Sequence, residues 1–478
     1  MVSTRAANLP PQYLGQAATR CFPALTNNAS FTRGMGRSVH IARDRLVNPT
    51  VVYGNFYMTG ASEHAPLGTG TLKVALEYPL GTFTLANECV AAGNAAVAFP
   101  VGNTSLTFAV TVPKGARFWL RSYQVNAAGI LWTQVAGGNG SYGAPADEGF
   151  EIGTIDNDKT VNGVVAYGNG IAFFPLVIAT LKRTPGILIL GDSREAGGVG
   201  GVIDATADVG PAARIVGPQA GYTQFAMSAT LQSGWNAGSH AWLLALVAAG
   251  FWTHMLNCYG ANDIGNGDSA ATVVAARAGC AASAKGVKAD LIVIGNTLYP
   301  YLASSDVFVT KVNQTAGSNQ LRILALNDAI RSGIAGEDAV WDEADGIDPF
   351  REGKYPVSRD PSLAARTPAS VTGAISGTTL TVTMIAVGSL GAGDYLYDAG
   401  GNIADSTWIV EQLTGTTGGT GTYRVSKSHS GFPYHNTVTS TTITTAGQVT
   451  RDGLHAQFAG EELIVRRVGA QLHQLLAN

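Results

Sequence analysis

The stretch that decides the fold is GILILGDS at residues 186–193. Four apolar residues follow one another without interruption, and a glycine, an acid and a serine come directly after them. A short unbroken apolar run of this kind is typical of a strand buried on both faces, as in a parallel sheet. The polar triplet then places Ser193 at the carboxyl edge of that sheet, where α/β folds bind ligands.

From this stretch onward, strand-like and helical patterns alternate along the chain. Alternation of this kind indicates βαβ units and a parallel sheet, so we predict an α/β domain built from residues 181–360 and 449–478. Its expected strands are 186–190, 224–227, 252–259, 291–294 and 339–341, and its expected helices are 240–249, 270–284, 320–334 and 460–476.

A different pattern precedes the decisive stretch. Between residues 49 and 132 apolar and polar residues alternate, as in LKVALEY at 72–78, and turn signals separate the segments. Alternation with period two marks strands with one buried face, and several such strands favour a β-sandwich. We predict a jelly-roll-like sandwich over residues 1–180, in which residues 1–45 form an extended arm or an irregular segment.

Residues 361–448 interrupt the α/β pattern. This part is rich in Thr, Gly and Ser, with SGTTLTVT at 376–383 and GTTGGTGTY at 415–423. Thr favours strands and Gly supplies turns, whereas a structureless connection of this length is uncommon in a compact domain. We therefore predict a small all-β module inserted into the α/β domain.

The charge balance excludes several classes of partner. The 30 basic and 33 acidic residues give a net charge of -3, so neither a nucleic acid nor an anionic membrane surface is an expected partner. No secretory signal follows the N-terminus, and the longest apolar stretch, at 241–252, is shorter than the ~20 residues that span a bilayer. We expect an extracellular or virion-associated protein that leaves the cytoplasm by lysis or particle assembly.

The four cysteines give no sign of metal or redox chemistry. Cys21, Cys89, Cys258 and Cys280 form no C-x-x-C pair, and we predict that they are small buried apolar side chains. The spacing of Cys21 and Cys89 does not decide whether they form a disulfide.

Three short motifs carry the candidate chemistry. They are Gly-Asp-Ser at 191–193, Gly-Ala-Asn-Asp at 260–263, and Asp-Gly-Leu-His at 452–455. Each one lies at the end of an expected strand or just before an expected helix. Alone, each is more often an ordinary turn or a helix N-cap, but a parallel sheet brings all three positions to one edge.

The residue types at these positions fit acyl transfer. The hydroxyl of Ser193 needs a base to become a nucleophile, and His455 titrates in the right range to be that base. Asp452 can accept the second imidazole N–H and fix the tautomer. The side-chain amide of Asn262 and the backbone N–H of Ser193 are candidate oxyanion donors. Asp192, Gly260 and Asp263 are predicted to support them.

The three motifs in this order resemble those of the SGNH hydrolases, also called the GDSL esterase superfamily. The resemblance implies a three-layer α/β/α fold, the same four roles for Ser193, Asn262, Asp452 and His455, and no metal or other cofactor. The family also has a glycine near the end of the second strand, which gives a backbone N–H to the oxyanion. Here that segment reads FAMSAT at 225–230, so Ser228 or Ala229 is expected to serve.

Two weaker resemblances suggest the substrate. A β-sandwich before an SGNH domain is similar to the layout of some carbohydrate esterases, and the inserted module resembles repeats in phage tail proteins. We therefore predict a serine esterase that removes O-acetyl groups from a carbohydrate or polysaccharide. Trp408, Tyr423 and Tyr434 are candidates to stack on sugar rings, although such aromatics are more often the core of a small module.

Two alternatives stay open from the sequence. One is a structural or receptor-binding tail protein that uses the hydrolase fold as a scaffold. The other is a general carboxylesterase or lipase that acts on small esters, although no long apolar lid segment flanks the motifs. A homo-oligomer is compatible with the sequence, which does not give the oligomeric state.

Overall fold

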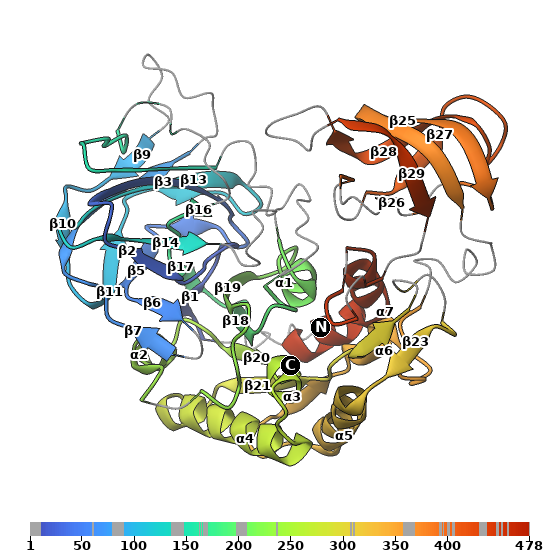
Figure 1. The fold of residues 1–478 in the computed structure, drawn as a ribbon. Coiled ribbons are helices and arrows are strands. Elements are labelled where there is room, and N and C mark those ends of the chain that lie inside the picture. The colour runs from blue at the N-terminus through green and yellow to red at the C-terminus, as the bar shows by residue number, and fades with distance from the viewer. Residues whose placement is uncertain are drawn as a thin grey trace, which may run out of the picture.

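The structure is a computed structural model, and Figure 1 shows its fold. It describes residues 11–59, 62–78, 90–134, 148–161, 163, 165, 171–196, 208–235, 238–305, 308, 311–356, 369–391, 394, 396–398, 402–403, 407–429, 437–445, 449–450, 453–456 and 458–477.

A five-stranded parallel sheet lies at the centre of the α/β part. Its strand order is β19-β18-β20-β21-β24, and every neighbouring pair is parallel. The decisive stretch forms β18, which has neighbours on both sides and is buried at all six positions, as its apolar run predicted. The strands are β18 (Gly186–Gly191), β19 (Gly221–Ala226), β20 (His254–Cys258), β21 (Ile292–Asn296) and β24 (Ala339–Trp341).

Helices cover both faces of this sheet, so the part has three layers. Leu188 and Leu190 share a hydrophobic core with residues of α2 (Ala241–Ala248) and α4 (Ala270–Val287). Ile187 and Ile189 point to the opposite side and pack with α1 (Pro211–Val216) and α7 (Phe458–Ala477). The predicted α/β architecture with a parallel sheet is therefore correct.

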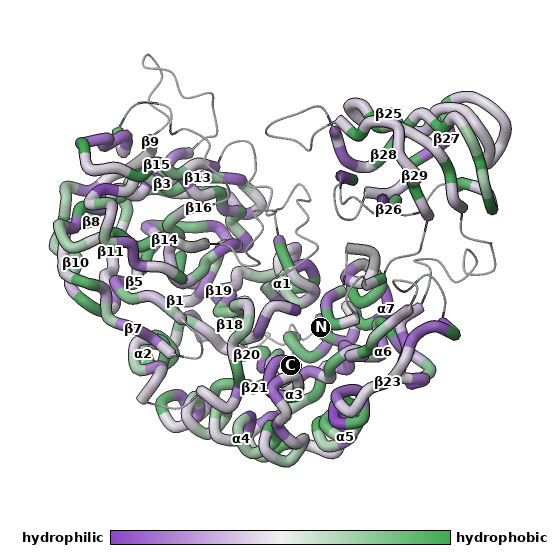
Figure 2. The backbone as a smooth tube through the Cα atoms, viewed as in Figure 1, coloured by the Kyte–Doolittle hydropathy of each residue, from purple (hydrophilic) through white to green (hydrophobic). Residues whose placement is uncertain are grey.

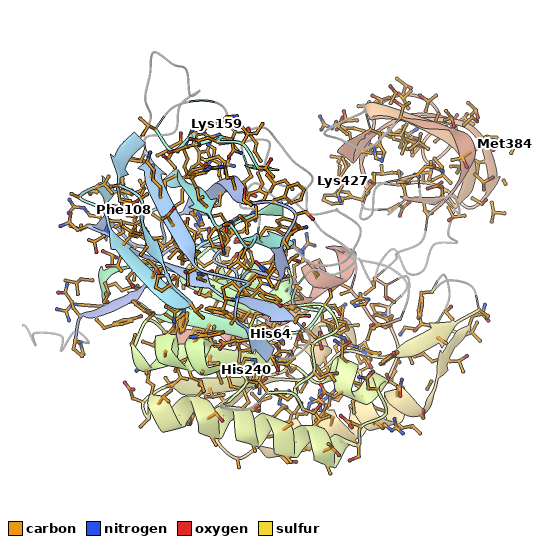
Figure 3. The ribbon with its side chains drawn as sticks, turned by 60° about the vertical axis from the view of Figure 1, so that its left-hand side comes forward. His64, Phe108, Lys159, His240, Met384 and Lys427 are labelled. Carbon is orange, nitrogen blue, oxygen red and sulfur yellow. The ribbon has the colours of Figure 1, made fainter. Side chains whose placement is uncertain are left out.

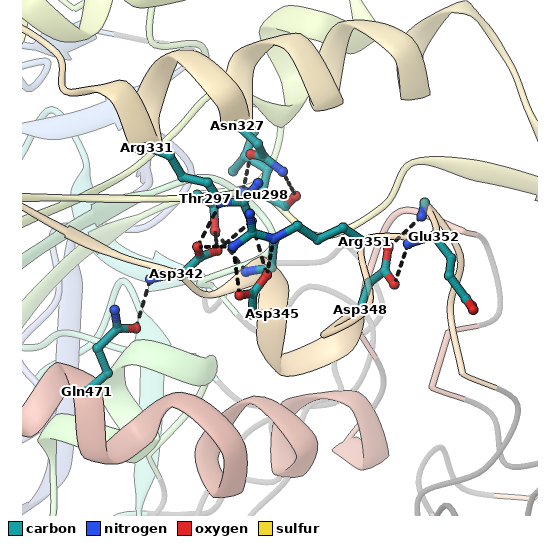
Figure 4. Close-up of polar contacts among 12 residues, drawn as sticks. Thr297, Leu298, Asn327, Arg331, Asp342, Asp345, Asp348, Arg351, Glu352 and Gln471 are labelled. Atoms are coloured by element: carbon teal, nitrogen blue, oxygen red, sulfur yellow. Dashed lines mark hydrogen bonds and ion pairs between the residues drawn. The ribbon is translucent and has the colours of Figure 1, made fainter.

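Helix α5 (Ser318–Ser332) packs beside α4, and Figure 2 shows both hydrophobic and hydrophilic residues along it. A polar network holds its last turn to the end of β24 (Figure 4). Arg331 donates two hydrogen bonds of 2.7 Å to the carboxylate of Asp342, and Gln471 of α7 accepts the backbone N–H of Asp342 at 3.0 Å. The remaining short helices are α3 (Ala261–Gly265) and α6 (Ala344–Ile347).

Two antiparallel sheets precede the α/β part, with strand orders β1-β17-β5-β11 and β10-β8-β13-β3-β15. Val51 and Tyr53 of the first sheet and Phe118 and Leu120 of the second belong to one core, so the sheets pack face to face. The jelly-roll connectivity stays a prediction. The strands of these two sheets are β1 (Tyr13–Gln16), β3 (Arg33–Ile41), β5 (Thr50–Asn55), β8 (Gly70–Glu77), β10 (Val97–Phe99), β11 (Gly102–Thr107), β13 (Arg117–Val125), β15 (Gly149–Gly153) and β17 (Val177–Lys182), with β9 (Val90–Gly93) paired to β8.

Short strands form smaller ladders around these sheets. They are β2 (Thr26–Asn28), β4 (Leu46–Val47), β6 (Tyr57–Thr59), β7 (Ser62–His64), β12 (Thr111–Val112), β14 (Ile130–Gln134) and β16 (Ile171–Ala172) in the N-terminal part, and β22 (Leu302–Ser304) and β23 (Gln314–Ala316) in the α/β part.

The prediction of an arm or irregular segment over residues 1–45 is wrong for its described part. Strand β3 lies inside the six-stranded sheet and pairs with both β13 and β15. It shows no clear period because seven of its nine residues are buried. The expectation of one buried face also fails for β13, where Arg121 is fully buried, 2.8 Å from Glu77.

The N-terminal part packs directly on the α/β part. Cys21 forms a parallel bridge with Thr223, so the segment around it covers the free edge of β19. On β7, the carboxylate of Glu63 accepts the N–H groups of Trp242 and Leu243 at the start of α2. Figure 3 shows His64 and His240 together at this contact.

Residues 370–445 contribute only strands to the described structure. They form one antiparallel sheet of order β26-β29-β25-β28-β27, and among the described residues its hydrophobic core consists of Ala369 and residues of this stretch. In Figure 1 this sheet stands apart from the other two parts, and Figure 3 shows Met384 and Lys427 on it. Its strands are β25 (Ser370–Val387), β26 (Leu396–Asp398), β27 (Ile409–Gln412), β28 (Gly421–His429) and β29 (Val438–Thr445).

Three of the four cysteines are buried, as predicted. Cys21, Cys258 and Cys280 are buried with free thiols, whereas Cys89 lies outside the described residues. Within the part of the chain that the structure describes, none of the helices has the length and apolar character that crossing a bilayer requires.

Candidate active site

Ser193 lies in the turn that directly follows β18, at the carboxyl edge of the parallel sheet. Its side-chain Oγ is 2.7 Å from Nε2 of His455, a hydrogen-bond distance. Ser193 is 7% exposed, so the hydroxyl is largely shielded from water. The structure therefore brings together the nucleophile and the base that the motifs predicted.

The turn that carries Ser193 is fixed by buried polar contacts. Asp192 accepts the backbone N–H of Arg194 at 2.9 Å, and Arg194 donates to the carbonyl of Tyr299 at 2.9 Å. The guanidinium of Arg194 also lies over the Tyr299 ring, 4.2 Å from its centre. Burial raises the pKa of Asp192 above its usual range, against the opposing effect of the neighbouring Arg194 cation.

His455 comes from the loop that precedes α7. Asp452, predicted to orient its imidazole, lies outside the described residues, and its role stays a prediction. Gly453 and Leu454 connect the two positions, and Leu454 is half-buried against the core that includes α3 and α5.

Asn262 and Asp263 lie on α3, immediately after β20. The Asn262 amide donates one hydrogen bond to the Thr230 carbonyl at 3.0 Å, and a primary amide keeps a second N–H. Asp263 is fully buried and accepts the backbone N–H groups of Gln232 at 2.9 Å and Ser233 at 2.8 Å. Asp263 thus holds the loop after β19 in place, and its supporting role in catalysis stays a prediction.

That loop contains the two predicted backbone donors, Ser228 and Ala229. Ala229 has φ 62°, the left-handed conformation that glycine adopts most readily. In the described part of the chain, no acceptor is found for the backbone N–H of either residue. Ala229 therefore takes the backbone conformation that favours a glycine, and the role of either N–H as an oxyanion donor stays a prediction.

Two buried glutamates beneath the site were not predicted. Glu195 follows the nucleophile turn and accepts the Ala212 N–H at 3.0 Å, while Glu343 accepts the side-chain amide of Asn296. The Oε1 atom of each has no partner among the described residues. Burial raises the pKa of both glutamates, to about 8 for Glu343. Neighbouring carboxylates raise these pKa values further: Glu343 acts on Glu195, and Asp192 acts on Glu343.

The sequence offered only a weak signal for this pair. Glu195 stands two residues after Ser193, but Glu343 is far away in the chain and belongs to no motif.

Among the described residues, no three of His, Cys, Asp or Glu gather closely enough to hold a metal ion.

Neither a protein-family model nor a curated protein matches the sequence. Solved structures do match. A member of the lipolytic G-D-S-L family from Veillonella parvula is 15% identical with a TM-score of 0.25, and the match covers 36% of this chain and 85% of that one.

Two carbohydrate esterases are also similar to this chain. A family two carbohydrate esterase from Clostridium thermocellum, in complex with cellohexaose, is 10% identical with a TM-score of 0.24, over 67% of this chain and 83% of that one. A carbohydrate acetylesterase from Sinorhizobium meliloti is 14% identical with a TM-score of 0.24, over 34% and 85%. The resemblance to GDSL proteins that the motifs predicted is thus also found among solved structures, at TM-scores that assign no residue roles.

Trp408, Tyr423 and Tyr434 of the inserted part were predicted to be candidates to stack on sugar rings, and their surroundings differ. The ring of Tyr423 is fully buried in the core of that sheet and its hydroxyl donates to the Gly419 carbonyl at 2.6 Å, so it presents no face to a sugar. Trp408 is half-buried, and Tyr434 lies outside the described residues. The stacking prediction is therefore wrong for Tyr423, which packs as a core residue.

Proposed function

We propose that this protein is a serine ester hydrolase of SGNH type that removes O-acetyl groups from a carbohydrate or polysaccharide. The observation that carries the proposal is the 2.7 Å contact between Ser193 Oγ and His455 Nε2 at the carboxyl edge of a parallel sheet. A serine and a histidine in hydrogen-bond reach form the pair that activates a hydroxyl nucleophile.

The first half of the reaction transfers the acetyl group to the enzyme. His455 Nε2 takes the proton of Ser193 Oγ as that oxygen bonds to the acetyl carbonyl carbon. The carbonyl oxygen becomes an oxyanion, for which the proposed donors are the backbone N–H of Ser193, that of Ser228 or Ala229, and the second N–H of the Asn262 amide. The intermediate then expels the sugar oxygen, which takes the proton from His455.

The second half regenerates the enzyme. His455 removes a proton from a water molecule as that water attacks the acetylated Ser193. Acetate leaves, and the proton on His455 returns to the serine oxygen. Asp452 is proposed to accept the other imidazole N–H, which fixes the tautomer and stabilises the imidazolium.

The carbohydrate part of the proposal rests on the rest of the chain. Low charge, a β-sandwich before the motifs and a β module between the second and third motifs suit an extracellular or virion-associated enzyme acting on a polymer. The site itself belongs to the α/β part, so small esters are expected to be hydrolysed as well.

The test is hydrolysis of para-nitrophenyl acetate at neutral pH, with Ser193→Ala and a matched control, Ser283→Ala. Ser283 lies on the exposed face of α4, where its hydroxyl donates to the Gly279 carbonyl. We expect Ser193→Ala to lose several orders of magnitude in kcat and Ser283→Ala to match the wild type. A fluorophosphonate probe should label the wild type and leave Ser193→Ala unlabelled.

Two outcomes would replace the proposal. If the wild type is inert toward the ester and the probe, the fold serves as a binding scaffold of a tail protein. If activity rises with acyl-chain length, the protein is a general carboxylesterase or lipase. Acetate release from acetylated polysaccharides, compared with release from small esters, then identifies the substrate class.

A further inference from the structure

The loop that carries His455 is closed at its base. Thr450 and Ala456 form an antiparallel bridge, so the chain leaves and re-enters at the same place. The neighbouring Val449 is buried with Ala456 in the core shared with α7. The base of the loop is therefore anchored in the α/β core, directly after the chain returns from the inserted sheet.

A hydrogen bond inside the loop sets its shape. The Thr450 hydroxyl oxygen accepts the backbone N–H of Gly453 at 3.0 Å, and Thr450 is fully buried. Gly453 has φ 73°, a left-handed conformation. A Cβ atom at this position would lie 1.9 Å from the Leu302 carbonyl oxygen and 2.5 Å from Cζ of Phe308. The chain can therefore make this turn only with glycine at 453.

The hairpin β22–β23 supports the loop from outside. The backbone N–H of Leu302, at the start of β22, donates to the Gly453 carbonyl at 2.9 Å. The hairpin is itself fixed, because Gln314 of β23 exchanges two hydrogen bonds with the backbone of Tyr355, at 2.8 and 3.0 Å. The Tyr355 hydroxyl donates to the Pro300 carbonyl at 2.7 Å, just before β22.

We propose that Thr450, together with the hairpin β22–β23, positions His455 for proton transfer and separates it from movements of the inserted sheet. This inference rests on the proposed esterase function and adds a positioning residue that no motif contains. The imidazole must stay near its 2.7 Å contact with Ser193, and a misplacement of about 1 Å typically costs about 10²-fold in rate.

The test compares Thr450→Val with Thr450→Ser on para-nitrophenyl acetate. Valine keeps the shape but cannot accept the Gly453 N–H, whereas serine can. We expect Thr450→Val to lower kcat about 10–100-fold with KM within about 2-fold, and Thr450→Ser to restore most of kcat. The matched control is Thr19→Val, because Thr19 is also fully buried and accepts the Ile41 N–H at 3.1 Å, in the N-terminal part.

The outcomes separate this inference from the proposed function. If the wild type and all variants neither hydrolyse the ester nor react with a fluorophosphonate, the esterase proposal fails. If the wild type is active and folded Thr450→Val keeps the full kcat and pH profile, only the positioning role fails. Should Thr450→Val not fold, Thr450→Ala takes its place, with the labelling rate measured on the folded fraction seen by circular dichroism.

Discussion

Ser193 Oγ and His455 Nε2 lie 2.7 Å apart, although the two residues are 262 positions apart in the chain. The inserted sheet accounts for part of this separation. Its first strand residue, Ser370, pairs with Thr444 at the end of its last strand, so the chain enters and leaves the sheet at neighbouring points. A module attached in this way can be added to the loop before His455 without moving Ser193 and His455 apart.

The amide of Asn262 is predicted to stabilise the oxyanion. Asn262→Ala should lower kcat toward para-nitrophenyl acetate by about 10²–10³-fold with little change in KM, because the donor acts mainly in the transition state. The measurement is steady-state kinetics at neutral pH, with circular dichroism to confirm the fold. A variant with unchanged kcat would remove Asn262 from the oxyanion site.

The left-handed backbone of Ala229 leads to a second prediction for the same site. Left-handed backbone costs a residue with a Cβ about 1 kcal/mol, and glycine avoids that cost. Ala229→Gly should therefore keep kcat within about 2-fold and not lower the melting temperature. Ala229→Pro, which cannot adopt positive φ and has no N–H, should lose activity. Equal activity of the two variants would exclude a role for this N–H.

The buried Glu343 predicts a pH-dependent stability. Burial raises its pKa to about 8, against the Asn296 hydrogen bond and the Arg194 cation, and Asp192 and Glu461 raise it further. In the unfolded chain a glutamate ionises near pH 4.5. Between about pH 4.5 and 8 the folded state thus holds a proton that the unfolded state has lost. The free energy of unfolding should fall as pH rises through this window, by up to about 1.4 kcal/mol per pH unit.

Glu343→Gln tests this assignment because glutamine stays neutral at every pH. Urea unfolding between pH 5 and 9 should show a weaker decline for the variant than for the wild type. The matched control is Glu352→Gln, whose exposed carboxylate pairs with Lys311 at the surface. Parallel pH profiles for wild type and Glu343→Gln would mean that Glu343 is ionised in the folded state.

The sequence predicted the α/β part because its strands are local apolar runs. Strand β18 and the strand at 339–341 were predicted almost to the residue, since an unbroken apolar run can be recognised without knowing its partner strands. Strand β3 was missed because its polar residues are buried through distant partners. His40, for example, is fully buried with its Nδ1 atom 2.9 Å from the Thr19 carbonyl oxygen, and nothing near His40 in the sequence indicates that contact.

The same distinction holds for the site. Ser193 and His455 belong to short motifs, and motif order was enough to predict that these two side chains lie close together. Glu343 and Thr450 have no motif, and their place near the site depends on contacts between segments far apart in the chain. Residue type and motif order therefore identified the candidate site residues. The residues that hold them in place through packing could not be predicted from the sequence.

Glu63 is predicted to stabilise the joint between the N-terminal sheets and α2. Its carboxylate accepts the N–H groups of Trp242 at 2.8 Å and Leu243 at 2.7 Å, which the helix itself cannot satisfy. Glu63→Ala should lower the free energy of unfolding by about 1–2 kcal/mol and leave kcat on small esters unchanged. Glu352→Ala, which removes only an exposed ion pair, should change stability by less than about 1 kcal/mol.

Removing the inserted sheet is predicted to separate small-ester from polymer activity. Because Ser370 and Thr444 are neighbours, a short linker can replace residues 369–448 while the loop before His455 keeps its own anchors. Among the described residues, the hydrophobic core of the sheet consists of residues from 369 to 443, so we expect its loss to leave the cores of the α/β part intact. Hydrolysis of para-nitrophenyl acetate should stay within about 2-fold of the wild type, and deacetylation of polysaccharide should fall at least about 10-fold.

Binding to the polymer distinguishes this explanation from damage to the site. The full-length Ser193→Ala variant should still sediment with acetylated polysaccharide, whereas the same variant without residues 369–448 should not. If the deletion instead reduces both activities equally, the inserted sheet stabilises the loop that carries His455 and does not act by binding the polymer. That outcome would also contradict the inference that Thr450 and the hairpin β22–β23 separate His455 from movements of the inserted sheet. The position of His455 would then depend on that sheet.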